Sequence, residues 1–189
     1  MRNVEVQKVE RVLEDRFSVD RATVRYERPD GSMSELTDRL CMERGDAAAV
    51  LVYDRGAGEL LLVRQFRYAT LRHGEPFLLE IVAGSIDPGE SPEEAARRET
   101  REETGYRVRD LRLAAQYYSS PGGVSEKLHI YYGEVGKDDQ VSAGGGEEGE
   151  DVEIVRLSAA EAFRRMDEGE IKDGKTLVAL LWMRANVTL

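Results

Sequence analysis

The chain has 189 residues, of which 41% are hydrophobic and 34% are charged, and its net charge is −10. This length suits one well-buried domain with a small appended subdomain, and the acidic balance argues against nonspecific binding to nucleic acid or to an anionic membrane. Cys41 is the single cysteine, so no intrachain disulfide can form. Because no signal-peptide or membrane-spanning pattern is evident either, we expect a cytoplasmic protein.

Residues 4–40 alternate between apolar and polar side chains without a helical period, and they contain the turn signal Pro29-Asp30-Gly31. This pattern predicts short antiparallel strands that form a small N-terminal β-subdomain over residues 1–45. Such a meander buries little surface by itself, and its edges need a cover. Two arrangements stay open from the residues alone: packing on the main domain, or exchange with a second chain.

Apolar runs separated by turn signals predict the elements of a main domain over residues 46–189. Strands are expected over residues 46–53, 59–68, 77–82, 111–118, 127–135 and 152–157. Helices are expected over residues 92–104, 159–166 and 176–183. Residues 84–90 are expected to be a loop, and residues 136–149, which are rich in glycine and acids, a mobile loop. The fold class predicted is α+β, a sandwich with a mixed sheet between helices, preceded by the β-subdomain.

The helix over residues 92–104 has the clearest boundaries. Ser91 is placed to cap its first turn, Pro92 occupies the first helical position, and Glu94 completes a capping box. Gly105 is a natural stop at the C-terminal end.

Three carboxylates of this helix share one face about a turn apart, because Glu99, Glu102 and Glu103 are spaced by three and four residues. Like charges stacked in this way repel one another. A hard divalent cation such as Mg²⁺ reverses the sign of the interaction, since it prefers oxygen ligands and carries substrate phosphates in its remaining positions. The alternative is a solvated helix held by ion pairs such as Glu94 with Arg98.

The stretch from Gly84 to Tyr106 resembles the Nudix box, G-x5-E-x7-R-E-U-x-E-E-x-G-U, where U is a bulky apolar residue. Thr100 departs from this pattern at the first U position, and Tyr106 fills the second. The resemblance implies a Nudix α/β/α sandwich and metal-assisted hydrolysis of a diphosphate that is linked to another moiety. The matching positions are Gly84, Glu90, Arg98, Glu99, Glu102, Glu103 and Gly105.

Stretches outside the box are similar to narrower groups of the superfamily. Pro121, within a Ser-Pro-Gly-Gly loop, is placed as in the ADP-ribose pyrophosphatase branch. Residues 120–129, 143–155 and 169–176 resemble the bacterial GDP-mannose pyrophosphatases. The implied substrate is a nucleoside diphosphate sugar, the implied cofactor is Mg²⁺ with Mn²⁺ as an alternative, and the implied assembly is a homodimer.

The resemblance also implies the metal ligands, which are the side chains of Glu99 and Glu103 and the backbone carbonyl of Ala83. Glu102 would join them directly or through a water molecule. Gly84 would let the backbone turn so that the Ala83 carbonyl faces the metal.

The remaining positions of the box receive supporting roles. Arg98 is expected to pair with the acids and hold their rotamers, and Glu90 to bond loop amides. Gly84 and Ser85 are expected to lie at the substrate.

The catalytic base has several candidates. Glu150 is the best match to a loop carboxylate that reaches the metal centre in the relatives, with Glu147 and Glu148 as alternates. The alternative is that this acidic loop is simply solvated. Glu126 is a second candidate that could point into the substrate cleft or into solvent.

Candidate substrate contacts lie before and after the box. Arg67 is the expected phosphate clamp, since a guanidinium offers paired donors to phosphate oxygens. Arg64 is expected to face the opposite side and pair with an acid. Lys175 resembles a substrate-contacting lysine of the GDP-mannose group.

In the N-terminal region, Phe17 and Arg39 match positions that contact nucleotide across a dimer interface in the relatives. The relatives favour tyrosine at 17 and Lys-Arg-Glu where this chain has Asp38-Arg39-Leu40. ADP-ribose and other nucleotide sugars therefore stay open beside GDP-mannose.

Two other functions stay open. One is a catalytically silent Nudix domain that binds ADP-ribose or a nucleotide sugar as a sensor, and the other is a mononucleotide or coenzyme A pyrophosphatase. The intact set of box carboxylates favours the enzyme over the sensor. The remaining reactive residue types, His73, His129 and Cys41, are expected to be structural or surface residues because none has partners at zinc or nucleophile spacing.

Overall fold

The computed structural model describes residues 2–146 and 151–188. The chain forms two compact units, residues 1–46 with 118–127, and residues 47–117 with 128–189. The first unit thus includes a segment that was expected in the main domain. The assignment of residues 1–45 and 46–189 as domains stays a prediction. Within the described ranges, no helix has the length and apolar character needed to cross a membrane.

The first unit is a three-stranded antiparallel sheet in the order β1-β2-β3. Its strands are β1 (Val4–Glu14), β2 (Ser18–Tyr26) and β3 (Thr37–Glu43). The predicted antiparallel subdomain is therefore confirmed. Residues 118–127 join it through β3, because Met42 N–H donates to the Gly123 carbonyl at 2.8 Å and Ser125 N–H donates to the Met42 carbonyl at 3.2 Å.

The second unit is built on a mixed sheet in the order β10-β5-β4-β9-β8, with β6 paired to β5 and β7 paired to β4. The strands β4 and β9 run parallel, whereas β5 is antiparallel to both β4 and β10. The bounds are β4 (Ala47–Asp54), β5 (Glu59–Phe66), β6 (Phe77–Glu80), β7 (Val82–Ser85), β8 (Leu111–Tyr118), β9 (Lys127–Val135) and β10 (Glu153–Ser158). The predicted mixed sheet is confirmed.

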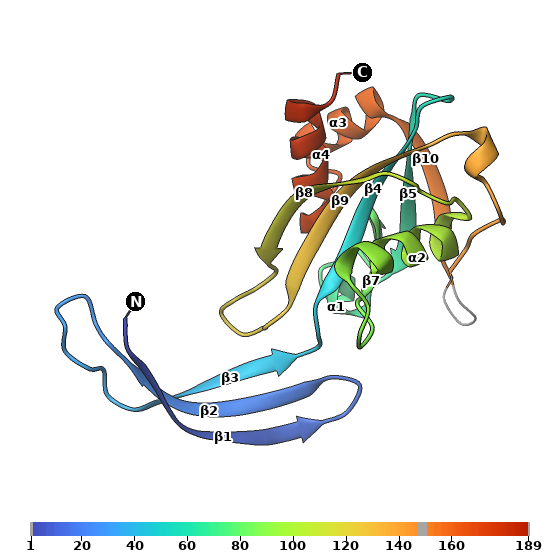
Figure 1. The fold of residues 1–189 in the computed structure, drawn as a ribbon. Coiled ribbons are helices and arrows are strands. Elements are labelled where there is room, and N and C mark those ends of the chain that lie inside the picture. The colour runs from blue at the N-terminus through green and yellow to red at the C-terminus, as the bar shows by residue number, and fades with distance from the viewer. Residues whose placement is uncertain (1, 147–150, 189) are drawn as a thin grey trace. The chain divides into compact units, whose positions relative to one another are not determined.

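Helices cover both faces of this sheet (Figure 1). The alternating residues of β4 show why: Ala47, Ala49 and Leu51 belong to the core cluster with α3 (Ala159–Asp167) and α4 (Gly174–Asn186). Ala48, Val50 and Val52 belong to the cluster with α2 (Pro92–Thr104). Because successive side chains of a strand point to opposite faces, a strand that is apolar throughout must be covered on both sides. The predicted α/β/α sandwich follows.

Several predicted boundaries are wrong near the site. The strand expected over residues 59–68 ends at Phe66, and a short helix α1 (Tyr68–Leu71) follows. The single strand expected over 77–82 is two strands, β6 and β7, because the chain changes partner from β5 to β4 at Ile81. Gly84 and Ser85 consequently lie in β7 and not in a loop. The expected loop 136–149 contains a 3₁₀ turn, Lys137–Asp139.

Helix α4 begins before its expected start at residue 176, because Asp173 caps it. The Asp173 carboxylate accepts from Thr176 N–H at 2.9 Å and from the Thr176 hydroxyl at 2.6 Å. The Thr176 hydroxyl oxygen in turn accepts from Ile81 N–H at 2.8 Å. This hydrogen bond joins the first turn of α4 to Ile81, the residue between β6 and β7.

Candidate active site

Helix α2 has the boundaries that its local sequence predicts. The Ser91 hydroxyl oxygen accepts from Glu94 N–H at 3.2 Å, and the Glu94 carboxylate accepts from Ser91 N–H at 2.8 Å, so the capping box is formed. Gly105 ends the helix in the left-handed conformation, with φ of 78°. Both ends are therefore satisfied locally, and the helix is a well-defined platform for its acids.

One face of α2 packs into the second unit's core. Ala95, Ala96 and Thr100 are fully buried, and the helix contacts β4 and β7. The threonine at an apolar position of the box is tolerated because its hydroxyl donates to the Ala96 carbonyl at 2.7 Å inside the helix. This packing leaves Glu103 3% exposed at the sheet side of the helix.

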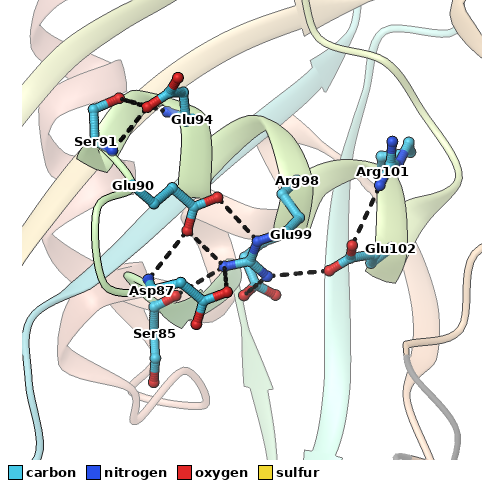
Figure 2. A network of polar contacts seen from close by, with 9 residues as sticks. All are labelled: Ser85, Asp87, Glu90, Ser91, Glu94, Arg98, Glu99, Arg101 and Glu102. Atoms are coloured by element: carbon cyan, nitrogen blue, oxygen red, sulfur yellow. Dashed lines mark hydrogen bonds and ion pairs between the residues drawn. The ribbon is translucent and has the colours of Figure 1, made fainter.

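Arg98 links the acids of the site (Figure 2). Its Nη1 donates to Glu99 Oε1 at 2.6 Å and to Glu102 Oε2 at 3.2 Å. Its Nε and Nη2 each donate to Glu90 at 3.0 Å, and Nη2 also donates to the Ser85 carbonyl at 2.9 Å. These hydrogen bonds, led by those to Glu90, raise the pKa of Arg98. The predicted pairing of Arg98 with the acids is observed.

Glu90 joins the loop before α2 to this network. Its carboxylate accepts from Asp87 N–H at 3.1 Å, as predicted for a residue that bonds loop amides. Arg98 holds the pKa of Glu90 below its usual value, with a smaller contribution from the Asp87 amide. The loop and the helix are therefore joined by an ionised pair that orients Glu99 and Glu102.

Strand β7 lies against the carboxylate of Glu99. A Cβ atom built on Gly84 would be 1.9 Å from Glu99 Oε1, so only glycine leaves room for that carboxylate beside the β7 backbone. The Ala83 and Gly84 backbone is held from the other side by pairing with Ala49 and Ala48 of β4. Carboxylate oxygens next to a strand backbone are the donor set that Mg²⁺ prefers, so these residues fit the implied metal.

The described residues do not form a preassembled cage for a cation. Among them, no group of three or more Asp, Glu, His or Cys side chains stands in metal-binding geometry. Glu99 and Glu102 are held by Arg98 instead. The predicted ligand and base Glu150 lies outside the described residues, as do its alternates, residues 147 and 148.

The predicted phosphate-binding side chains meet at a carboxylate that was not anticipated. Arg67 donates from Nε and Nη2 to the two oxygens of Glu80, at 2.8 and 2.9 Å. Lys175 donates to Glu80 and, at 2.9 Å, to Asp173. Arg64 pairs with Glu153 at 2.8 Å, as expected of this arginine. The sequence signal for Glu80 was a lone acid in the apolar run of residues 77–83, since a buried carboxylate needs cationic partners.

Three residues of the first unit form a separate cluster. Phe17 is 38% exposed, and the Arg44 guanidinium lies 5.4 Å from the centroid of its ring. Arg44 also pairs with Glu126 at 3.3 Å. Because Glu126 is only 7% exposed, the expectation that it could point to solvent is wrong. Arg44 was missed because nothing in its local sequence marks it.

Arg39 lies on β3 of the same unit. Its Nη1 donates to the Thr37 hydroxyl at 3.1 Å and to the Asp38 carbonyl at 3.2 Å. The Asp38 carboxylate accepts from the Thr23 hydroxyl at 2.8 Å. A nucleotide contact of Arg39 stays a prediction.

The residues expected to be structural or superficial have ordinary environments. His129 is buried in β9 with its Nδ1 2.8 Å from Gln116 Nε2. The neighbouring Glu43 raises the pKa of the Cys41 thiol, with burial as the next cause, so this cysteine is a poor nucleophile. His73 is exposed beside Arg72.

Comparison with known proteins gives consistent matches. The model of the NUDIX domain matches residues 43–178. A protein from Pectobacterium atrosepticum named GDP-mannose pyrophosphatase is 44% identical over 140 residues, 73% of this chain and 72% of the relative. One of the same name from Cronobacter sakazakii is 38% identical over 94% of this chain and 93% of its own length. A crystal structure described as an ADP compounds hydrolase has a TM-score of 0.72 and 27% identity, covering 96% of this chain and 92% of its own.

Proposed function

Since the chain belongs to the NUDIX domain family, we propose that it hydrolyses the diphosphate bond of a nucleoside diphosphate sugar to a nucleoside monophosphate and a sugar phosphate. The observation that carries this proposal is the acidic face of α2 beside the β7 backbone, where Arg98 joins Glu99 and Glu102 to Glu90 of the preceding loop. GDP-mannose and ADP-ribose are the two leading substrates.

The proposed metal ligands are Glu99, Glu103 and the Ala83 carbonyl, together with Glu150. Mg²⁺, or Mn²⁺ in its place, would supply neutralisation of the phosphate oxygens and activation of water. Arg98 orients the carboxylates so that they do not have to be ordered during turnover.

The proposed base is Glu150, and Glu126 is the second candidate. Arg67 and Lys175 are proposed to hold the diphosphate, with Gly84 and Ser85 beside it. Phe17 and Arg39 are proposed to contact the nucleotide.

Purified enzyme with Mg²⁺ is expected to release phosphomonoesters from at least one nucleotide sugar. The panel is GDP-mannose, ADP-ribose, ADP-glucose, UDP-glucose and a dinucleoside polyphosphate, with a phosphatase to convert the products to free phosphate. Preference for GDP-mannose means that Phe17, Asp38 and Leu40 are tolerated changes, whereas preference for ADP-ribose means that they retune the nucleotide site. Binding without hydrolysis of any compound contradicts the enzyme and indicates a sensor.

The assembly that we propose is a homodimer formed through the first unit. On one face of its sheet the paired residues are Val4 with Tyr26, Val6 with Val24, and Val9 with Ala22. Val4, Val6 and Val9 are 65%, 57% and 58% exposed, although they line an apolar stripe. Among the residues that the structure describes, β1 is an edge strand of this small sheet and these valines are exposed. A small sheet of this kind is marginal by itself, and a second copy would bury the stripe.

Sedimentation equilibrium is expected to give the mass of two chains for the wild type and of one chain for Val6→Lys, because a charge in the stripe opposes burial. Glu10→Lys is the control. Glu10 lies opposite Arg21 in the register of β1 and β2, on the face of the sheet that does not carry the apolar stripe. A wild-type monomer, or dimers of both variants, would rule out this interface.

We place the enzyme in the cytoplasm and expect no nucleic-acid or membrane partner. The net charge of −10 disfavours polyanionic surfaces. The single cysteine fits a reducing compartment.

A further inference from the structure

Glu80 is a buried carboxylate at the end of β6, with a side chain that is 2% exposed. Burial by itself would raise the pKa of Glu80, but hydrogen bonding and charge interactions with Arg67 and Lys175 outweigh it, and the pKa lies below its usual value. The carboxylate is therefore ionised inside the second unit, and two cations depend on it.

Glu80 holds Arg67 through both of its oxygens. Two of the five guanidinium N–H donors are used in this pair, those on Nε and one on Nη2. The remaining donors lie on the half of the guanidinium that is turned away from Glu80. The Arg67 side chain is 40% exposed. Arg67 is thus a partly exposed guanidinium whose orientation is fixed by Glu80, and a fixed guanidinium is well suited to binding phosphate oxygens.

Lys175 is held by the Glu80 carboxylate and by a series of contacts that leads back to the residue after Glu80. It pairs with Glu80 and with Asp173, and its side chain is only 12% exposed. Asp173 caps α4 through Thr176, and Thr176 accepts from the amide of Ile81, the residue after Glu80. The position of the Lys175 ammonium is therefore set by both the strand and the helix.

We propose that Glu80 is a positioning residue for diphosphate binding, which orients Arg67 and Lys175 so that both reach one anionic group. This inference rests on the proposed function. If Glu80 served only the stability of the fold, its ion pairs would add little to the free energy of unfolding, because a buried ion pair stabilises a fold no better than apolar side chains of similar volume. A positioning role explains why the carboxylate pairs with two cations and why one of them, Arg67, stays partly exposed.

Glu80→Gln is expected to raise KM for the preferred nucleotide sugar by about tenfold or more, since the side chain loses its charge and its bidentate pair. The kcat is expected to change by less than about threefold, because the carboxylates of α2 are untouched. Glu80→Asp keeps the charge on a shorter side chain and should give an intermediate KM. Glu153→Gln is the control, because Glu153 pairs with Arg64 of strand β5 and not with Arg67, and it should leave KM unchanged.

The double variant separates positioning from general destabilisation. If Glu80 acts through Arg67, Glu80→Gln should raise KM much less in an Arg67→Ala background than in the wild type. A lowered melting temperature with wild-type KM in Glu80→Gln would show a structural role only and overturn the inference. Should Glu80→Gln fail to fold, Glu80→Asp decides, and wild-type KM in that variant overturns it as well.

Calorimetric titration with inorganic pyrophosphate keeps this test independent of turnover. If the wild-type chain hydrolyses nothing in the panel, the proposed function fails, but weaker pyrophosphate binding by Glu80→Gln still supports the positioning role. Equal affinities of the wild type and Glu80→Gln for pyrophosphate, or no binding of pyrophosphate to the wild type, would overturn the positioning role of Glu80.

Discussion

Glu103→Gln is expected to abolish hydrolysis while the protein stays folded. Glu103 is 3% exposed on α2, the helix that packs against β4 and β7, and it is one of the proposed metal ligands. A cation that polarises a phosphoryl group contributes several kcal/mol to the transition state, so kcat should fall by about 10² to 10⁴. The amide has nearly the same size and shape as the carboxylate, so the packing of α2 is kept and the melting temperature should change little.

Steady-state kinetics with the preferred nucleotide sugar, combined with thermal melting by circular dichroism, checks this result. Glu93→Gln is the control: Glu93 lies on the same helix, pairs with Arg97 at 2.6 Å, and its side chain is 53% exposed. It should keep nearly full activity, since exposed helix pairs contribute little. Near-wild-type activity of Glu103→Gln with Mg²⁺ would show that Glu103 is not a metal ligand.

Gly84→Ala is expected to lower kcat by about tenfold to a hundredfold, the range for a displacement of roughly 1 Å at a catalytic group. The new Cβ would lie 1.9 Å from Glu99 Oε1 and 2.0 Å from its Cδ, so the carboxylate must leave its place. Because these atoms are the far end of a flexible side chain, Glu99 can rotate away at a small cost in folding free energy. The effect should therefore fall on catalysis and on the Arg98 contact more than on stability.

The measurement compares kcat, the Mg²⁺ concentration at half-maximal rate, and the urea midpoint of the wild type and the variant. Gly136→Ala is the control, since its backbone is extended and the nearest heavy atom to a new Cβ is Asp139 Oδ2 at 3.9 Å. A large fall in the urea midpoint of Gly84→Ala, or unchanged kcat and metal dependence, would contradict the close approach of Glu99 to β7.

Helix α2 is the part of the site that local sequence predicts best. Its start, its end and the shared face of its acids follow from the capping box, Gly105 and the helical repeat. All of these signals lie within a few residues of what they control. The apolar run of β4 likewise predicts burial on both faces, which requires helices on both sides of the sheet.

Which strands and side chains contact one another could be determined only from the tertiary structure. The change of pairing at Ile81 depends on β5 and β4 lying side by side, which no local pattern around Ile81 reveals. Glu126 is buried and pairs with Arg44, which is distant from it in sequence.

The difference between what local sequence predicts and what tertiary contacts decide is clearest at Arg67, Glu80 and Lys175. The sequence identified Arg67 through its guanidinium chemistry and Lys175 through its resemblance to a lysine of the GDP-mannose group, and both signals are local. It did not reveal that one buried carboxylate holds both, since Glu80 and Lys175 are 95 residues apart. Residue type determines what a side chain can bind, whereas contacts between distant segments determine which partner reaches it, and that depends on how the strands and helices pack.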